Sequence, residues 1–282
     1  MKISKSLDSL RHTVKQWRND GLSIGFVPTM GNLHAGHMAL VELAGEQCDK
    51  VVVSIFVNPL QFNEVHDFEA YPITLEADQQ KLMTLETDLL FLPDSELMYP
   101  QGQAIMSKVR VPEIGDTLEG ASRPGHFEGV ATVVNKLFNQ VQPDRAFFGE
   151  KDFQQVLLIR KMVQDFNLPI EIQTLPTQRE ADGLAMSSRN SRLSASQRVI
   201  AAELYRVLVE AREQLRAGLI DIQQVEQQAL QSLKTAGFEP EYVSARDISS
   251  LLPAKHGQKG QVLLAAARLG DVRLIDNLLI DQ

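Results

Sequence analysis

The sequence is poor in cysteine and has no long apolar runs. Cys48 is the only cysteine among 282 residues, so no internal disulfide can form, which is typical of proteins from a reducing compartment. No apolar run approaches the length of a membrane-spanning helix, and residues 1–17 lack the apolar core of a signal peptide. We therefore expect a cytoplasmic protein with no membrane partner.

Positive charge is also scarce. The chain has 28 lysine and arginine residues against 36 aspartate and glutamate residues, a net charge of −8. This balance disfavours a general role in binding nucleic acid or anionic membranes, although a local basic pocket for an anion is compatible with it. The hydrophobic share of 44% is ordinary for a globular protein, and the length suits one large or two ordinary domains.

Short apolar runs in the first part of the chain predict five buried strands, with helical patterns between them. Residues 50–57 (KVVVSIFV) are apolar on both faces, as in a parallel strand covered by helices. Residues 126–141 place their apolar side chains in one stripe at helical spacing. Strands that alternate with helices favour an α/β fold with a doubly wound parallel sheet. The five predicted strands are residues 23–27, 50–57, 88–92, 145–148 and 170–175.

The pattern changes after about residue 176. Ser194 and Gln197 form a capping box that starts a helix predicted to run to Gly218, and a second helix ends at Gly237. Helices followed by adjacent strands indicate a small α+β domain. We predict two domains, residues 1–176 and 177–282. The strand-like runs are residues 241–248, 260–270 and 271–280, with a tight turn joining the last two.

Polar clusters follow three of the five predicted strands of the sheet. In an open parallel sheet, ligands bind beyond the carboxyl ends of the strands. The clusters are residues 28–37 (PTMGNLHAGH), 58–62 (NPLQF) and 149–155 (GEKDFQQ). The strand at 88–92 leads instead into PDSELMYP, which has no comparable cluster. The sequence therefore places the candidate site at the ends of the strands predicted at residues 23–27, 50–57 and 145–148.

The first cluster combines glycines with two histidines. Glycine lets the backbone approach a ligand, and the helix that begins near Gly36 would offer free N–H groups to an anion. His34 and His37 would add donors. The spacing matches neither the dinucleotide fingerprint nor the P-loop. A metal site would need ligands that neither cysteines nor a nearby third histidine supply, yet a metal and a purely structural role both stay open.

Two further segments suit a phosphate group. Lys151 stands at a helix start, where the helix dipole disfavours a cation unless an anion is also present. Residues 182–190 (DGLAMSSRN) put two hydroxyls and an arginine on a loop after a glycine, which suits a polyphosphate. A solvated lysine and an ordinary serine-rich loop are the alternatives.

Neutral and basic side chains near the same strand ends suit a small organic acid. Asn58 and Gln61 can donate to and accept from a hydroxy acid or an amide. Arg123 and His126 stand at the start of the helix predicted at residues 126–141. Each of these alone is compatible with a structural role, and their convergence on one edge of the sheet favours a ligand site.

Taken together, five motifs resemble the pantothenate synthetase (pantoate–β-alanine ligase) family of the nucleotidylyltransferase superfamily. They are PTMGNLHAGH, FVNPLQF, LEGASRPGHFEGV, FGEKDFQQ and DGLAMSSRN, in the family's order and over nearly the whole chain. The resemblance implies a Rossmann-like N-terminal domain, a smaller C-terminal lid, and a homodimer formed through the N-terminal domain.

The resemblance also assigns site residues. Gln61 and Gln155 would bind pantoate, with Gln61 also near β-alanine, and Asn58, Arg123 and His126 complete the expected substrate-binding set. Asp78 matches a position associated with Mg²⁺, with Ala77 where some members have a second carboxylate. The expected ATP contacts are Met30, Gly31, Asn32, Leu33, His34, Ala35, Gly36, His37, Gly149, Glu150, Lys151, Asp152, Gln178 (through its main chain), Met186, Ser187, Ser188 and Arg189.

The implied reaction is the ATP-dependent condensation of (R)-pantoate with β-alanine to pantothenate, AMP and pyrophosphate through a pantoyl adenylate, with Mg²⁺. The expected catalytic groups, which neutralise charge on the phosphates, are His34, His37, Lys151, Ser187 and Arg189. The alternatives are a nucleotidylyltransferase that transfers AMP to a phosphorylated acceptor, a nucleotide-binding regulator without turnover, and a metallohydrolase using His34, His37 and Asp78.

Overall fold

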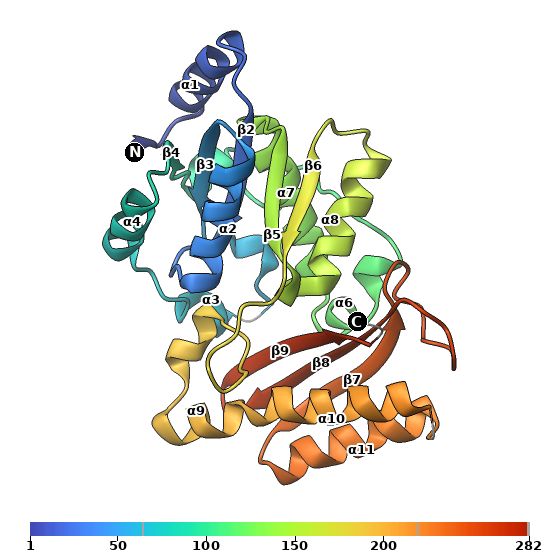
Figure 1. Cartoon of the computed structure of the whole chain (residues 1–282). Helices are drawn as coiled ribbons and strands as arrows, with labels where there is room; N and C mark the ends of the chain where they lie inside the picture. Colours follow the sequence, from blue (N-terminus) through green and yellow to red (C-terminus); the bar gives the residue numbers. More distant parts are fainter. Residues whose placement is uncertain (64, 219, 281–282) are drawn as a thin grey trace. The chain divides into compact units, whose positions relative to one another are not determined.

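The computed structural model describes residues 1–63, 65–218 and 220–280, with residues 65 and 66 described by their backbone alone. The chain divides into two compact units. The first consists of Met1–Glu150 and Gln155–Pro176, and the second of Lys151–Gln154 and Thr177–Gln282 (Figure 1). Over the described ranges, every helix is too short or too polar to cross a membrane.

The first unit is built on a parallel six-stranded sheet. Its order is β1-β4-β3-β2-β5-β6, so the predicted doubly wound α/β fold is confirmed. The five predicted strands are β2 (Ile24–Thr29), β3 (Lys50–Ile55), β4 (Leu89–Phe91), β5 (Arg145–Gly149) and β6 (Glu171–Leu175). The sequence pattern missed β1 (Lys2–Ser4), because three residues with only one apolar side chain carry no strand signal until they pair with β4.

Short helices and 3-10 turns connect these strands. The predicted helix over residues 126–141 is confirmed as α7 (His126–Val141), and most of its side chains are buried. The others are α1 (Leu7–Asn19), α2 (Ala35–Gln47), η1 (Pro59–Gln61), α3 (Val65–Glu69), α4 (Leu75–Thr84), α5 (Ser95–Met98), η2 (Ile114–Asp116), α6 (Glu119–Ser122), η3 (Glu150–Asp152) and α8 (Phe153–Asp165). One core cluster joins Val41 and Ala44 of α2 to Val27, Val53 and Phe147 of the sheet.

The strand order determines where the site lies. From β2 the chain proceeds outward through β3 and β4, and then returns to place β5 on the other side of β2. The carboxyl ends of β2, β3 and β5 are therefore neighbours at the point where the winding direction changes, which is where doubly wound sheets bind ligands. The segments that begin at Met30, Phe56 and Glu150 start from these ends.

The second unit is a small α+β assembly, as predicted. Its antiparallel sheet has the order β7-β8-β9, formed by β7 (Glu239–Asp247), β8 (Gln261–Leu269) and β9 (Val272–Leu279). Gly270 and Asp271 make the predicted tight turn, with Leu269 paired to Val272 and Gly270 at φ +58°. The helices are η4 (Ser188–Arg192), α9 (Ala195–Ala201), α10 (Glu203–Ala217) and α11 (Ile222–Thr235).

The first of these helices differs from the prediction in one respect. The capping box is confirmed, since Ser194 Oγ accepts from the Gln197 N–H at 3.2 Å and Gln197 Oε1 from the Ser194 N–H at 2.9 Å. The prediction of one continuous helix to Gly218 was wrong, because α9 ends at Ala201 and α10 begins at Glu203. The Ala202 N–H points to the Ile200 carbonyl, so the regular i→i−4 ladder is broken there.

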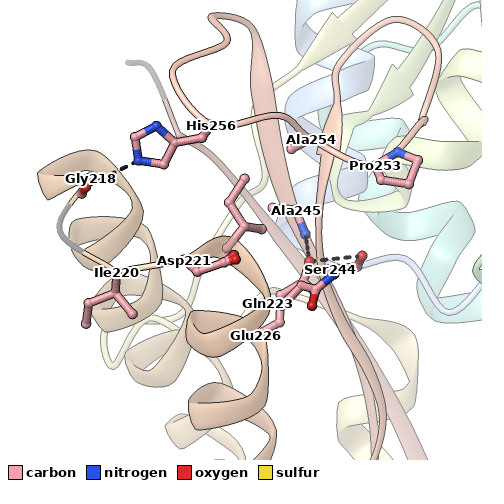
Figure 2. A pocket seen from close by; sticks show the side chains of 11 residues that line it. Gly218, Ile220, Asp221, Gln223, Glu226, Ser244, Ala245, Pro253, Ala254 and His256 are labelled. Carbon is pink, nitrogen blue, oxygen red and sulfur yellow. Dashed lines mark hydrogen bonds between the residues drawn. The ribbon is translucent and has the colours of Figure 1, made fainter.

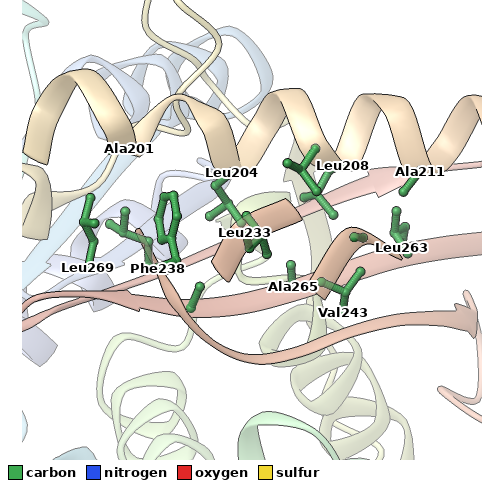
Figure 3. Close-up of a cluster of buried hydrophobic side chains, with 14 of the residues drawn as sticks. Ala201, Leu204, Leu208, Ala211, Leu233, Phe238, Val243, Leu263, Ala265 and Leu269 are labelled. Atoms are coloured by element: carbon green, nitrogen blue, oxygen red, sulfur yellow. The ribbon is translucent and has the colours of Figure 1, made fainter. Parts of the chain in front are cut away.

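A cluster of apolar side chains forms the core of the second unit (Figure 3). Leu204 and Leu208 of α10 and Leu233 of α11 lie in the same cluster as Leu263 and Ala265 of β8. The helices thus bury one apolar stripe each against the sheet, which is the arrangement that stabilises a two-layer α+β unit.

Candidate active site

The two histidines of the first motif cap helix α2. His34 is the N-cap, and its Nδ1 accepts from the Gly36 N–H at 3.2 Å. The His37 Nδ1 accepts from the His34 N–H at 3.3 Å, and the two ring centroids are 4.1 Å apart. A neutral imidazole whose Nδ1 accepts carries its proton on Nε2. The caps therefore select the tautomer in which Nε2 can donate to an anion.

These contacts correct one part of the sequence argument. The start of α2 was expected to offer free N–H groups, but the His34 and Gly36 N–H groups are bonded to the two imidazoles. The Asn32 and Leu33 N–H groups are bonded to the Asp78 carboxylate, each at 2.8 Å. Four main-chain donors of this motif are thus bonded within the protein, so fewer N–H groups are free at this helix start than the sequence suggested.

Asn58 and Gln61 lie together after β3. The buried Asn58 Nδ2 donates to Gln61 Oε1 at 3.1 Å and to the Gly129 carbonyl at 3.2 Å. With its oxygen engaged by Asn58, the Gln61 amide directs Nε2 to the Met30 Sδ, 2.9 Å away. The motif after β2 and the motif after β3 therefore meet at these side chains.

Gly129 allows this close approach. A Cβ on Gly129 would lie 2.3 Å from the Leu60 carbonyl oxygen and 2.8 Å from the Gln61 nitrogen. Real Cβ atoms do not come so close to backbone, so any other residue would push α7 away from η1. Gly129, the last glycine of the LEGASRPGHFEGV motif, thus has a packing role at the site.

Arg123 and His126 contact the main chain of Gln61. The His126 Nδ1 lies 2.7 Å from the Gln61 carbonyl oxygen, which can only accept, so Nδ1 carries the proton. Its Nε2 then accepts from Arg123 at 3.2 Å, and Arg123 also donates to the Gln61 carbonyl at 3.3 Å. The sequence predicted both as substrate-binding residues, and the structure places both where they hold Gln61.

Tyr99 was missed from the sequence. Its hydroxyl donates to Asn58 Oδ1 at 2.6 Å, and the side chain is buried. Burial raises the pKa of the Tyr99 phenol, which keeps the hydroxyl protonated as a donor. Tyr99 follows β4, the strand end that showed no polar cluster. A tyrosine in that loop is the only signal by which it could have been found.

The segment after β5 carries Gly149, Glu150, Lys151 and Asp152. Thr174 of β6 donates to the Glu150 carboxylate at 2.8 Å in the first unit. In the second unit, the Asn277 amide donates to the Lys151 carbonyl at 2.9 Å, and the Lys151 ammonium is 3.8 Å from the Asp152 carboxylate. Gln155 lies half-buried in the first turn of α8.

The segment from Gln178 to Arg189 forms a short hairpin followed by η4. The Met186 N–H donates to the Gln178 carbonyl at 2.9 Å, and Arg179 pairs with Ala185. The Ser187 Oγ caps η4 by accepting from the Arg189 N–H at 3.2 Å. Ser187, Ser188 and Arg189 therefore lie within one ordered turn at the end of this hairpin.

A buried ion pair anchors the hairpin. Arg179 donates to both oxygens of Asp276 on β9, at 2.7 and 2.9 Å, and to the Gly183 carbonyl at 3.0 Å. Its guanidinium lies 4.1 Å from the Tyr205 ring centroid. Burial raises the pKa of Asp276, and Arg179 opposes that rise. At φ +91°, with Tyr205 where a Cβ would lie, Gly183 is needed for this packing.

A separate cavity of about 640 Å³ lies in the second unit (Figure 2). It is lined by the start of α11 and by β7, where Glu226 accepts from the Ala245 N–H at 2.7 Å. His256 lies on its rim, 3.2 Å from the Gly218 carbonyl. Its lining includes none of the site residues expected from the sequence.

Magnesium does not fit the expected position. The two Asp78 oxygens accept main-chain N–H groups, and Ala77 supplies no second carboxylate. Over the described part of the chain, no group of three or more histidine, cysteine, aspartate or glutamate side chains is arranged to hold a metal ion. The metallohydrolase alternative therefore lacks its ligands among these residues.

The fold and the gathered side chains define the class of the protein. A doubly wound parallel sheet, with imidazole and amide side chains beyond the ends of two adjacent strands, is the arrangement of Rossmann-like nucleotide-binding enzymes. Within that class the chain belongs to the pantoate–β-alanine ligase family, whose model matches residues 2–279.

Known proteins similar over their full length support this placement. The chain is 54% identical over 278 residues to the pantothenate synthetase of Pseudomonas aeruginosa strain UCBPP-PA14, covering 99% of this chain and 98% of that protein. It superposes on pantothenate synthetase from Thermus thermophilus with a TM-score of 0.93 and 42% identity, over 100% of both chains. The Francisella tularensis pantoate–β-alanine ligase, solved with beta-gamma ATP and β-alanine, gives a TM-score of 0.85 and 36% identity, over 99% of this chain and 98% of that one.

Proposed function

We propose that the chain joins (R)-pantoate to β-alanine, with cleavage of ATP to AMP and pyrophosphate, through a pantoyl adenylate. The observation that carries this proposal is the contact of Gln61 with Met30, which joins the segment that carries the capped imidazoles of α2 to the segment that carries the Gln61 amide. The imidazoles suit a phosphate, and the amide suits a hydroxy acid. The relatives named above are similar over the whole chain, which supports the same reaction.

In the first step, the pantoate carboxylate attacks the α-phosphate of ATP. An oxygen–phosphorus bond forms, and the bond to the departing pyrophosphate breaks. The Nε2–H groups of His34 and His37 are assigned as donors to the phosphates, where charge develops. The other assigned phosphate contacts are Lys151, Ser187, Ser188 and Arg189, and Met30 to Gly36, Gly149, Glu150, Asp152, Gln178 and Met186 complete the proposed ATP set.

In the second step, the amine of β-alanine attacks the acyl carbon of the adenylate. The carbon–nitrogen bond forms, the amine loses a proton, and AMP leaves with the electrons of the carbon–oxygen bond. Gln61 and Gln155 are assigned to pantoate, with Gln61 also near the amine. Asn58, Arg123 and His126 hold Gln61 in place, so their proposed part in substrate binding acts through it. The protein's contribution is alignment of the reacting groups.

Two half-reactions test this function. Pyrophosphate exchange into ATP should require pantoate, and AMP release should then require β-alanine. Dependence on a phosphorylated acceptor would support the transfer of AMP without ligation instead, and ATP binding without turnover would support a regulator. His256→Ala, on the rim of the separate cavity, is the control that should leave both half-reactions unchanged.

Mg²⁺ is proposed as part of the nucleotide substrate. ATP phosphates bring their own oxygen ligands, and magnesium commonly binds through substrate phosphates with few protein ligands. A rate that follows the concentration of the Mg–ATP complex, with no additional requirement for free Mg²⁺, would support this. A second, saturable free-Mg²⁺ requirement would contradict it.

We also propose a cytoplasmic homodimer formed through the N-terminal domain. The family resemblance suggests the dimer, and the lone Cys48 with a net charge of −8 suits a reducing compartment without anionic-membrane binding. Light scattering on the purified chain should give twice the mass of 31.5 kDa. A monomer at micromolar concentration would contradict the dimer.

A further inference from the structure

The backbone just before His34 takes a conformation that must be held by its surroundings. Gly31 and Asn32 are consecutive residues with positive φ, +84° and +48°. Asparagine is one of the few residues other than glycine that visit this left-handed region, and it persists there where neighbouring groups hold it. The turn presents the Asn32 and Leu33 N–H groups to a single carboxylate, in the manner of an anion-binding nest.

The anion in this nest is the side chain of Asp78. Asp78 is on α4, 0% exposed, and its two oxygens accept from the Asn32 and Leu33 N–H groups at 2.8 Å each. A hydrogen bond to a carboxylate is about twice as strong as one between neutral groups. Glycine suits position 31 because its φ of +84° is strained for other residues, and a Cβ would also come within 3.3 Å of an Asp78 oxygen and 3.1 Å of Ile55.

Two other residues of the α4 segment contact the same turn. The Lys81 ammonium donates to the Leu33 carbonyl at 2.5 Å, and the hydroxyl of the N-cap Thr74 donates to the Asn32 side chain at 3.4 Å. Thr74, Asp78 and Lys81 are spaced by four and three residues, so they share one face of the helix. This face thus contacts the Asn32 side chain, the N–H groups of Asn32 and Leu33, and the Leu33 carbonyl.

This arrangement argues against Asp78 as a magnesium ligand. Magnesium keeps several waters and near-octahedral geometry, whereas Asp78 is wholly enclosed by protein and both its oxygens accept main-chain donors. The nearby ammonium of Lys81 would also repel a divalent cation. Main-chain N–H donors to both oxygens are what a carboxylate that orders a loop would have.

We propose that Thr74, Asp78 and Lys81 form a loop clamp, which sets the turn at Gly31–Leu33 and thereby the orientation of His34 and His37. Asp78 is its central positioning residue, and it acts on adenylation without touching substrate or metal. Leu33 directly precedes the N-cap His34, so a displaced turn displaces the capping box and both imidazoles. This inference rests on the proposed function for its catalytic consequence, although the clamp itself can be measured without substrates.

Asp78→Asn tests the clamp most directly. The amide keeps the shape of the carboxylate but turns one acceptor into a donor, so one of the two N–H groups loses its partner. We expect the pantoate-dependent exchange rate to fall by roughly ten- to a hundredfold, as for a misplacement of about 1 Å. The Mg²⁺ requirement at a fixed ATP concentration should not change. Rescue of the rate by added Mg²⁺ would overturn the proposal.

Hydrogen exchange of the apoprotein separates the clamp from the proposed function. In Asp78→Asn the Asn32 and Leu33 amides should exchange about tenfold faster or more, while amides of the central strands keep their protection. Unchanged exchange would overturn the clamp whether or not the chain makes pantothenate. Faster exchange with an unchanged adenylation rate would show that the clamp exists but does not orient the imidazoles, which would overturn its assigned role.

Milder variants keep the test decisive if Asp78→Asn does not fold. Lys81→Met removes only the donor to the Leu33 carbonyl, and Thr74→Val removes only the hydroxyl near Asn32. Both should slow adenylation severalfold with an unchanged Mg²⁺ requirement. If Asp78 were instead a metal ligand, Lys81→Met would improve Mg²⁺ use. Glu76→Gln, which changes an exposed carboxylate in the first turn of α4, is the matched control and should alter nothing.

Discussion

The two units each hold a phosphate-assigned segment with a buried aspartate, but they do so in different ways. In the first unit, Asp78 binds the main chain of the segment itself, one residue before His34. In the second unit, Asp276 binds Arg179 at the base of a hairpin, seven residues before Met186. The first arrangement holds two successive N–H groups of the binding segment itself. The second arrangement anchors only the base of the hairpin. The following η4 is held by its own cap, the Ser187 hydroxyl.

The two aspartates should therefore have different roles, Asp78 in activity and Asp276 in stability. Loss of Asp78 should affect the rate of adenylation more than the stability of the fold, because the N–H groups that it binds belong to a loop. Loss of Asp276 should affect stability first, because it leaves the Arg179 charge largely buried and unpaired.

The largest expected effect is on stability. Asp276→Ala should lower the free energy of unfolding by about 3–5 kcal/mol, because one partner of a buried ion pair is removed. Urea unfolding followed by circular dichroism would measure it. Glu203→Gln breaks an ion pair to Arg206 that is partly exposed, and it should cost less than about 1 kcal/mol. Equal losses in both variants would show that the Arg179–Asp276 pair stabilises the fold no more than a partly exposed ion pair does.

The next effect is a split between the half-reactions. His37→Ala in the first unit and Lys151→Ala in the second should each slow adenylation by roughly 10²–10³, the scale of losing one preorganised donor. Amide formation from supplied pantoyl adenylate should lose clearly less, because pyrophosphate has already left. Single-turnover measurements of each step would show this, with Lys161→Ala as the control on α8. Equal losses in both steps would contradict the phosphate assignment.

A smaller effect is expected at the pantoate contact. Gln61→Ala should weaken the use of pantoate by about 1.5–3 kcal/mol, more than tenfold, because polar groups of the substrate lose their partners. ATP binding should change little, which calorimetry would show. Gln80→Ala, an exposed glutamine of α4, is the matched control. A folded variant with unchanged dependence on pantoate would remove Gln61 from the site.

The smallest expected effect is the difference in ATP protection between the two phosphate-assigned segments. Saturating ATP should slow hydrogen exchange around Met186 to Arg189 more than around Asn32 and Leu33, because the Asp78 carboxylate already bonds the latter amides. Amides of β8 provide the internal reference. Equal protection of both segments by ATP would mean that anchoring at the base is as restrictive as the clamp.

Much of the fold could be predicted because its signals are local. The apolar run at residues 50–57 and the stripe at 126–141 gave β3 and α7, and Ser194 with Gln197 gave the start of α9. These depend on side chains a few positions apart. The break at Ala202 was missed, since an alanine between two helical patterns carries no signal of a stop.

The partners inside the site could not be predicted in the same way. The pattern gave no reason to connect Asp78 with Asn32, 46 positions away, or Tyr99 with Asn58, 41 positions away. Arg123 and His126 were recognised as site residues, but their attachment to the Gln61 carbonyl follows from α7 packing on η1 beside Gly129.

The strands and helices, the motifs that follow the strands, and the family resemblance could be inferred from the order of the residues. Periodicity, caps and turns act between near neighbours, so they can be read along the chain. Three features follow only from the folded structure: the pairing of β1 with β4, the imidazole protons on Nε2 of His34 and His37, and the bond of Asp78 to the Asn32 N–H. A buried polar group must bond to whatever group the fold brings beside it, and that neighbour depends on topology rather than on position along the chain.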